Sequence, residues 1–399
     1  MMKKFVLREK DLERLSLFRD NTDFIKIITG VRRCGKSVLM EQFRDILKSD
    51  GVPDDRIFNF NLELPEFFSV KTGGDLPEIV FSKIPKEERC YVFFDEVQRA
   101  EGWERVVNSL MAGTNADIYI TGSNAHILSS ELSTYLTGRY VSIDMLPLSF
   151  SEWKVLRGDG MDDRTAFSRF MVYGGFPAID PSMDDFSIKT ALRDLYASVV
   201  KWDIASRGQI RNVDELDRLL TYLMHNIGNS ISLNSIVENM GAGRDMIERY
   251  LGLLEQAFVI YRADRYDISS SALRPHPKYY VVDQGIRDMA VGFTQKDSGR
   301  VLENIVYLEL LRRGNVVQVG KYGAKEVDFV THKTAGGQEY FQVCLSMQNE
   351  STAERELSAL RNVKDNFPKT VLTLDPVVRH VTEDGIVVMD VVEWLLNDF

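Results

Sequence analysis

A run near the start of the chain, residues 30–37, reads G-V-R-R-C-G-K-S and matches the P-loop spacing G-x-x-x-x-G-K-S. Its glycines let the backbone turn so that successive N–H groups face a polyphosphate. Lys36 is then expected to contact the β- and γ-phosphates, and Ser37 to offer its hydroxyl to Mg²⁺. The pattern predicts ATP and Mg²⁺ as cofactors, the alternative being a chance glycine turn before a helix. The predicted nucleotide contacts are Gly30, Arg33, Cys34, Gly35, Lys36, Ser37 and Val38.

Two acids complete the predicted site. The apolar run 90–94 ends in Asp95 and Glu96, and a continuous apolar run is typical of a strand buried on both faces. Asp95 is expected to hold Mg²⁺ together with Ser37, and Glu96 to act as general base on the attacking water. The alternative is an ordinary turn at the end of a strand.

Further residues are candidates at the same site. Ser123 and Asn124 follow a strand-like run, and one or the other is expected to orient water, although polar residues there are also ordinary turn formers. Arg139 is a candidate arginine finger, acting in cis or from a neighbouring subunit, or else a surface arginine that begins the next strand. The thiol of Cys34 is expected beside the phosphates, unless it faces the core.

Local patterns predict the elements that carry these residues. The run 25–29 is rich in β-branched residues, as in a buried strand, and 38–43 has helical apolar spacing. A strand, a glycine-rich turn and a helix are the context that a P-loop requires, and the helix N-terminus adds partial positive charge. We therefore expect an α/β P-loop ATPase core with a parallel sheet over residues 1–150.

Together these motifs resemble one family, the prokaryotic AAA+-superfamily ATPases that carry a C-terminal domain of unknown function. The resemblance covers almost the whole chain. It implies a doubly wound ATPase core, a winged-helix middle domain and a nuclease-like C-terminal domain, with partners that are poorly defined. The segments that carry the resemblance are 27–37, 94–98, 121–124, 135–140, 147–153 and 173–177.

Residues 151–292 are expected to form a helical and winged-helix domain. Segments 231–241 and 244–254 read as helix, tight turn, helix, and strand-like segments 258–262 and 278–283 would form the wing. Between residues 200 and 275 there are nine Lys or Arg and ten Asp or Glu, whereas a DNA-reading module should be basic. Interdomain packing is therefore favoured over DNA contact.

Residues 293–399 have the outline of a restriction-endonuclease-like α/β domain, with Glu303 on a helix and Asp328 on a strand. Nucleases of this fold carry E-x-K on the next strand, where this chain has Gln342-Val343-Cys344. An amide is a poor ligand for Mg²⁺, and a thiol is not a cationic donor. The domain is therefore expected to be catalytically inactive, with Lys325 or Lys321 as conceivable substitutes for the missing cation.

Composition sets limits on the function. The chain has 399 residues, is 44% hydrophobic and 27% charged, and has a net charge of −10, which does not favour a broad nucleic-acid surface. No apolar run is long enough for a membrane span. Three scattered cysteines fit neither a metal site nor a disulfide framework, so a cytoplasmic location is expected.

Two functions follow from these expectations. The first is Mg²⁺-dependent ATP hydrolysis coupled to a conformational change of the C-terminal domains, which engage an unknown protein or nucleic-acid partner. The second is a slow ATP-dependent switch or DNA-binding protein. Glu96 favours the first, because a pure binder needs no base. A homo-oligomer is possible, and nuclease activity is not expected.

Overall fold

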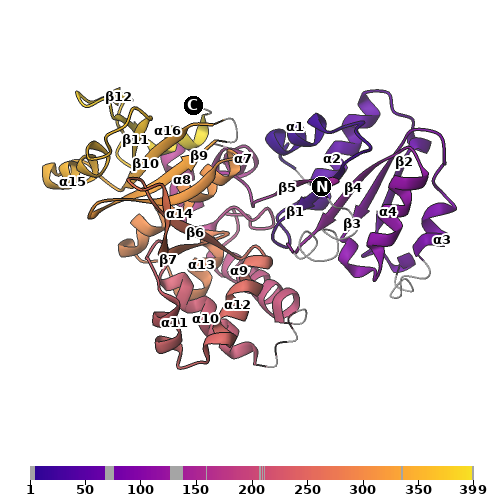
Figure 1. Ribbon diagram of the computed structural model, residues 1–399, viewed down its shortest axis with the longest axis horizontal. Coiled ribbons are helices and arrows are strands. Elements are labelled where there is room, and N and C mark those ends of the chain that lie inside the picture. The colour runs from indigo at the N-terminus through magenta and orange to yellow at the C-terminus, as the bar shows by residue number, and fades with distance from the viewer. Residues whose placement is uncertain are drawn as a thin grey trace. The chain divides into compact units, whose positions relative to one another are not determined.

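The computed structural model describes residues 5–67, 76–125, 138–158, 160–205, 208, 210, 212–333 and 336–397. The chain divides into two compact units. The first comprises Met1–Met145 with Gln256–Phe258, and the second comprises Leu146–Glu255 with Val259–Phe399. Figure 1 shows the first unit in indigo and purple, and each unit contains a sheet of its own.

The first unit is built on a five-stranded parallel sheet with the order β2-β3-β4-β1-β5. The strand β4 lies between β1, which precedes the P-loop, and β3, which carries the acids. Because all strands run in one direction, the residues that follow β1, β3 and β4 meet at one edge of the sheet. The strands are β1 (Ile25–Thr29), β2 (Ile57–Asn61), β3 (Cys90–Asp95), β4 (Ala116–Gly122) and β5 (Tyr140–Asp144).

Both faces of this sheet are covered. On one face, Phe43 of α2 packs against Phe93 and Tyr119, with ring centroids 6.5 and 5.0 Å apart. On the other, Phe94 and Ile120 join a core with residues of α3 and α4. Alternation along each strand sends neighbouring residues to opposite faces, which explains why the strands read as continuous apolar runs. The helices are α1 (Glu9–Leu17), α2 (Lys36–Ser49), α3 (Leu76–Phe81) and α4 (Trp103–Gly113).

The second unit begins with helices. They are α7 (Phe150–Arg157), α8 (Asp163–Tyr173), α9 (Asp185–Ala197), α10 (Val213–His225), α11 (Leu233–Met240) and α12 (Arg244–Gln256). An antiparallel hairpin, β6 (Ile260–Asp267) and β7 (Ala272–Val281), follows them. The remaining helices are α13 (Gln284–Val291), α14 (Ser298–Arg312), α15 (Glu350–Arg361) and α16 (Val391–Leu396).

The hairpin is part of an eight-stranded mixed sheet with the order β12-β13-β11-β10-β9-β8-β6-β7. Its other strands are β8 (Val316–Tyr322), β9 (Lys325–His332), β10 (Gln338–Cys344), β11 (Lys369–Thr373), β12 (His380–Val381) and β13 (Val387–Asp390). The domain boundary expected at residues 292–293 therefore falls inside one compact unit, because β6 pairs in parallel with β8 across it.

The glycine pair in the 173–177 segment has a structural reason. The buried carboxylate of Asp283 accepts a hydrogen bond from the backbone N–H of Gly175 at 2.6 Å. A Cβ at Gly174 would lie 2.1 Å from an oxygen of Asp283, so a side chain there would collide with it. Burial raises the pKa of Asp283 to about 6, although three backbone N–H groups stabilise its charged form. This motif therefore joins distant segments of the second unit.

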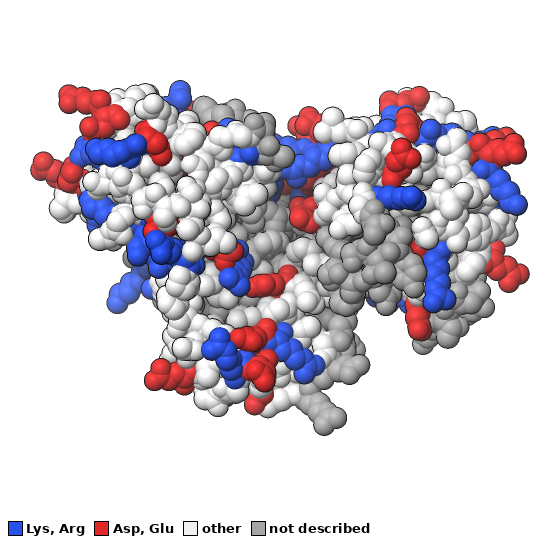
Figure 2. Space-filling model, viewed as in Figure 1, with Lys and Arg blue, Asp and Glu red and all other residues white. Residues whose placement is uncertain are grey.

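Acidic and basic side chains are interspersed on the face of the molecule in Figure 2, where no extended area of one sign stands out. Among the described helices, none is both long and apolar enough to cross a membrane.

Candidate nucleotide site and a closed lysine–carboxylate cluster

The loop between β1 and α2 makes a tight turn that needs glycine. Gly30 has a φ of +145° and Gly35 a φ of +111°. A Cβ at Gly30 would lie 2.1 Å from the backbone oxygen of Met145. Arg33 also adopts a positive φ, +66°, which is uncommon for a residue with a side chain. The loop therefore curls as a phosphate-binding turn does, and α2 begins directly at Lys36.

Lys36 lies inside this turn. Its ammonium donates hydrogen bonds to the backbone oxygens of Gly30 at 3.1 Å and Val31 at 3.2 Å. The same nitrogen is 3.8 Å from a carboxylate oxygen of Glu96. The side chain is 3% exposed and has only this one carboxylate within ion-pair distance among the described residues. Backbone carbonyl dipoles therefore solvate the ammonium at closer range than the carboxylate does.

Asp95 and Glu96 meet Lys36 at the carboxyl edge of the sheet. Asp95 accepts hydrogen bonds from the hydroxyls of Thr121 and Ser37. Burial raises the pKa of Asp95, and these two hydroxyls act against that shift. Two hard oxygen donors, the Asp95 carboxylate and the Ser37 hydroxyl, therefore lie together, which suits Mg²⁺.

Glu96 is held in an unusual backbone conformation. It has a φ of +55°, in the left-handed region. Its N–H donates to the Thr121 hydroxyl at 2.9 Å, and its carboxylate accepts from Gln98 and, at 3.4 Å, from the Ser123 hydroxyl. These hydrogen bonds fix the orientation of the carboxylate, as is required of a general base.

Thr121 belongs to the candidate site, although no sequence motif assigns it a role. Its hydroxyl donates to Asp95 and accepts from the backbone of Glu96, so it joins β4 to both acids. Ser123 is buried and Asn124 half-buried, both just beyond the same strand end. The signal in the sequence was the alternation of side chains along a strand, since Thr121 lies two positions before Ser123 and so shares its side of the strand.

Arg139 lies at the start of the parallel strands, whereas the P-loop lies at their carboxyl ends. Its backbone oxygen accepts from the N–H of Ile25, the first residue of β1, whereas the P-loop follows the last. A strand of five residues spans about 16 Å. Action of Arg139 in cis therefore disagrees with the topology, because parallel pairing of β1 and β5 puts both strand starts together. The helical segment expected at 130–136 is outside the described residues.

The thiol of Cys34 faces the core. Its side chain is fully buried, and the sulfur lies 3.2 Å from where a Cβ of Gly30 would be. Burial raises the pKa of the thiol, against the charges of Lys36 and Arg8. The expectation that this thiol lies open beside the phosphates is therefore wrong, because the tight turn rotates residue 34 inward. The backbone of Cys34 keeps its predicted place in the loop.

In the second unit, Lys278 of β7 forms a cluster with the acidic side chains of Glu303, Glu326 and Asp328, which we call the closed cluster. The ammonium of Lys278 lies 3.0 Å from Glu303 on α14 and 2.8 Å from Glu326 on β9. The hydroxyl of Tyr280 also donates to Glu303, at 2.7 Å. Neither Lys325 nor Lys321 supplies this cation; the residue that does so is far from the motif in sequence.

The charges of this cluster shift one another's pKa values. Burial alone would lower the pKa of Lys278, but Glu303, Asp328 and Glu326 together outweigh burial and raise it. Burial, followed by the nearby charge of Glu303, raises the pKa of Asp328 well above its usual range. The described residues contain no group of three or more His, Cys, Asp or Glu that could hold a metal ion.

Gln342 and Cys344 have structural partners. The Gln342 amide oxygen accepts from the N–H of Asp328 at 3.3 Å, and its NH₂ donates to the buried Glu356 at 2.8 Å. Burial raises the pKa of the Cys344 thiol to about 12, so it is neutral at pH 7. Neither residue supplies the carboxylate or the cation of E-x-K.

Fold and site together define a P-loop core of the AAA type. A family described as an AAA domain matches residues 22–154, and a domain of unknown function matches residues 164–297. An uncharacterized protein of Haemophilus influenzae is 39% identical over 410 residues, covering 100% of both chains. An uncharacterized protein of Methanocaldococcus jannaschii is 30% identical over 366 residues, covering 86% of this chain and 79% of its own. The chain belongs to one family with these two proteins, and its residues 22–154 are an AAA domain.

Solved structures give a weaker comparison. The replication initiator DnaA bound to AMPPCP and single-stranded DNA aligns with 64% of this chain and 90% of its own, at 14% identity and a TM-score of 0.33. AMPPCP-bound DnaA from Aquifex aeolicus aligns with 63% and 89%, at 12% identity and a TM-score of 0.30. Similarity at this level carries no argument about DNA or assembly.

Proposed function

We propose that this protein is a Mg²⁺-dependent ATPase that couples hydrolysis to a conformational change of its second unit, which engages a protein or nucleic-acid partner. The observation that carries the proposal is the convergence of Lys36, Asp95 and Glu96, linked through Thr121, at one edge of a parallel sheet. A positive charge for phosphates, oxygen ligands for a metal and an oriented carboxylate for water are the parts that phosphoryl transfer to water needs.

Each of these side chains has a distinct role in the proposal. Lys36 attracts the phosphate charge, and loop N–H groups with the α2 N-terminus add to it. Ser37 and Asp95 hold Mg²⁺, which neutralises charge on the phosphates when bound. Glu96 accepts the proton of the attacking water, while Ser123 and Asn124 orient that water.

Two substitutions test this proposal. Lys36→Ala should abolish tight ATP binding, because the phosphates lose their cation. Glu96→Gln should bind ATP as before but lower turnover by about 10²–10⁴-fold, the contribution typical of a general base. Binding of a fluorescent ATP analogue and phosphate release are the two measurements. Lys48→Ala, at a lysine 49% exposed on the same helix as Lys36, is the control. Wild-type turnover in Glu96→Gln would remove that residue as base.

A slow ATP-dependent switch is the second candidate. It would bind ATP through the same residues and release its partner on a time scale that hydrolysis sets. Partner capture from native cells with and without ATP, compared in rate with phosphate release, separates a switch from a motor.

An arginine finger in trans remains part of the proposal for Arg139, which is exposed at the far edge of its own sheet. In that case Arg139→Ala protein mixed with Lys36→Ala protein should regain turnover, since each supplies what the other lacks. No recovery at any mixing ratio, together with unchanged turnover of Arg139→Ala alone, would remove Arg139 from the mechanism.

The second unit is proposed to combine a winged helix with an inactive nuclease-like domain. The order α10, α11, α12 and then the β6–β7 hairpin supports the first part, and Glu303 on α14 with Asp328 on β9 supports the second. The ion pairs of Lys278 support inactivity, because a bound ammonium competes with any metal for the same carboxylates. Supercoiled and single-stranded DNA should stay intact with Mg²⁺ or Mn²⁺, with and without ATP.

A further inference from the structure

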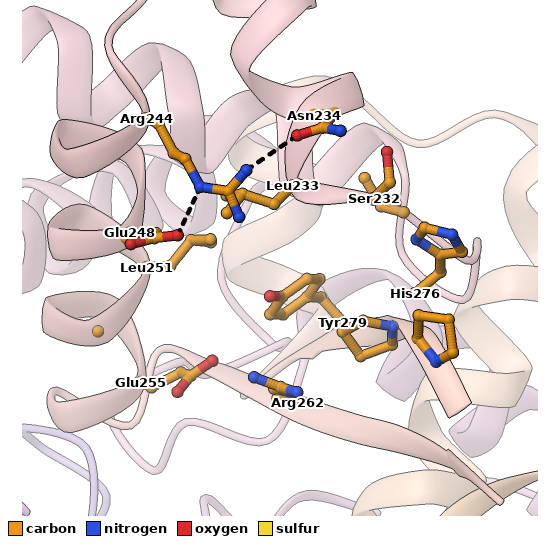
Figure 3. A pocket seen from close by; sticks show the side chains of 14 residues that line it. Ser232, Leu233, Asn234, Arg244, Glu248, Leu251, Glu255, Arg262, His276 and Tyr279 are labelled. Atoms are coloured by element: carbon orange, nitrogen blue, oxygen red, sulfur yellow. Dashed lines mark hydrogen bonds and ion pairs between the residues drawn. The ribbon is translucent and has the colours of Figure 1, made fainter. Parts of the chain in front are cut away.

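The second unit has a pocket of about 530 Å³ between α11, α12 and the β6–β7 hairpin (Figure 3). This volume is in the range of ligand sites and exceeds that of one side chain. The nucleotide site involves none of the residues that line it.

The wall formed by α12 is open at Gly252. A Cβ at this position would meet nothing within 4 Å. Glycine inside a helix costs about 0.5–1 kcal/mol relative to alanine, so local helix stability does not explain it. Its place between Glu248 and Glu255 on the pocket side keeps the space clear.

The opposite wall is strained and stiff. His276 has a φ of +66°, and it lies between Pro275 and Pro277. A residue before proline normally prefers the extended region, so this conformation is unfavourable by itself. Such strain persists where the surrounding structure enforces it, and it gathers at ligand clamps. Figure 3 shows His276 across the pocket from α12.

The charges in the pocket leave one carboxylate, that of Glu255, without a direct ion pair among the described residues. Arg244 donates to Glu248 at 3.0 Å, as the dashed lines in Figure 3 mark. Arg262 forms its ion pair with Asp264, at 2.8 Å. Within the described part of the chain, Glu255 has no hydrogen bond and no ion pair within 4.0 Å, although Arg262 faces it. Burial raises the pKa of Glu255, and the nearby charge of Arg262 opposes this shift.

The lining also offers an aromatic ring and an aliphatic side chain, beside its polar and charged members. The ring of Tyr279, 6% exposed, lies between α12 and His276 in Figure 3, and Leu251 projects beside it. A carboxylate next to an aromatic ring and aliphatic groups matches a cation that is planar and weakly hydrated. Guanidinium has these properties and forms two parallel hydrogen bonds with a carboxylate, whereas ammonium is more strongly hydrated.

We propose that this pocket receives an arginine side chain of a partner protein, with its guanidinium on the carboxylate of Glu255 and its stem against Leu251 and Tyr279. The remaining volume accommodates the residues that flank the arginine. The pocket would be a partner site of the second unit, and its occupation does not require ATP turnover.

Two small probes test the charge requirement. N-acetyl-arginine N-methylamide and its citrulline counterpart have the same shape, but only the first is charged. Saturation-transfer NMR titrations with the full chain should show arginine binding at least about tenfold tighter, as a hydrogen bond to a charged group gives. Glu255→Gln should abolish this preference, whereas Glu238→Gln, at an exposed glutamate on α11 outside the pocket, should retain it.

A second pair of variants tests the space. Gly252→Met should fill the pocket and abolish binding, whereas Gly252→Ala should retain it. Both fit a helical position with open space, so folding is preserved. ATP turnover should be unchanged in all four variants, which separates this inference from the proposed ATPase. Equal binding of the two probes, tighter binding of N-acetyl-glutamate N-methylamide, a preference that survives Glu255→Gln, or no binding up to the solubility limit would each overturn the proposal.

Discussion

Two buried lysines, one in each unit, differ in the groups that contact their ammonium. Lys36 is 3% exposed, bonds two backbone oxygens and keeps 3.8 Å from Glu96. Lys278 is 4% exposed and lies within 3.0 Å of both Glu303 and Glu326. The two side chains are therefore almost equally buried. They differ in whether carbonyl oxygens or carboxylates make the closest contacts with the ammonium.

This difference separates a lysine available to a ligand from one that serves the fold. Carbonyl dipoles solvate the ammonium of Lys36 but do not cancel its charge, so an incoming phosphate is still attracted. Two carboxylates outweigh the charge of Lys278, and this lysine compensates part of the cost of their desolvation. Burial of a charged residue therefore does not by itself identify a functional site.

The largest effect should come from removing the cation of the closed cluster. Lys278→Met keeps most of the length of the side chain but removes the cation that Glu303 and Glu326 share, and Glu326 retains its ion pair with Arg265 at 3.5 Å. The free energy of unfolding of the second unit should fall by about 3–5 kcal/mol, as for other broken buried ion pairs. Urea denaturation measures it.

Two matched variants sharpen that result. Lys333→Met removes an ion pair whose lysine is 53% exposed, and it should change the free energy of unfolding by no more than about 1 kcal/mol. Lys36→Met should also cost about 1 kcal/mol or less, since water can replace its bonds to two carbonyls. Similar losses for Lys36→Met and Lys278→Met would remove the distinction between the two lysines.

The next effect concerns the link between the strands of the nucleotide site. Thr121→Val keeps the shape but leaves Asp95 and the N–H of Glu96 without the hydroxyl that joins them. ATP turnover should fall by about 10- to 100-fold, corresponding to about 1–3 kcal/mol for a lost buried hydrogen bond. Thr114→Val, which removes a hydroxyl bonded to the Leu110 carbonyl at the end of α4, should leave kcat unchanged.

A smaller effect, on the affinity for Mn²⁺, is expected when Lys278 is removed from the closed cluster. The double variant Lys278→Ala with Gln342→Glu removes the competing ammonium and adds a carboxylate beside Asp328. It should bind Mn²⁺ at least about tenfold more tightly than Gln342→Glu alone, because hard cations prefer anionic oxygen ligands. Isothermal titration calorimetry measures both. Equal affinity would show that Lys278 does not occupy the position of a metal.

Mg-ATP is not expected to change the rate at which the Cys34 thiol is labelled. Its thiol is fully buried with a raised pKa, so iodoacetamide should label it slowly, both with and without Mg-ATP. Mass spectrometry of the labelled peptide, with the urea-unfolded protein as the fast reference, checks this. Rapid labelling that ATP suppresses would contradict the inward orientation of the side chain.

Much of the nucleotide site could be predicted from sequence because its parts are local. The glycine spacing of residues 30–37 needs no tertiary information, and the apolar run before Asp95 and Glu96 follows from burial of a parallel strand on both faces. The AAA match over residues 22–154 agrees with these motifs. Each such segment carries its own conformational preference, so one chain is enough to recognise it.

Tertiary structure decided whatever depends on strand order or on distant partners. Thr121 became a site residue because β4 lies between β1 and β3, and Arg139 moved to the far edge because β5 runs parallel to β1. Lys278 reaches Glu326 because β7 and β9 belong to one sheet, and it reaches Glu303 because α14 packs against β7. A charge on a strand does not reveal its counterion, since pairing across a sheet is set by register and burial, which sequence spacing does not encode.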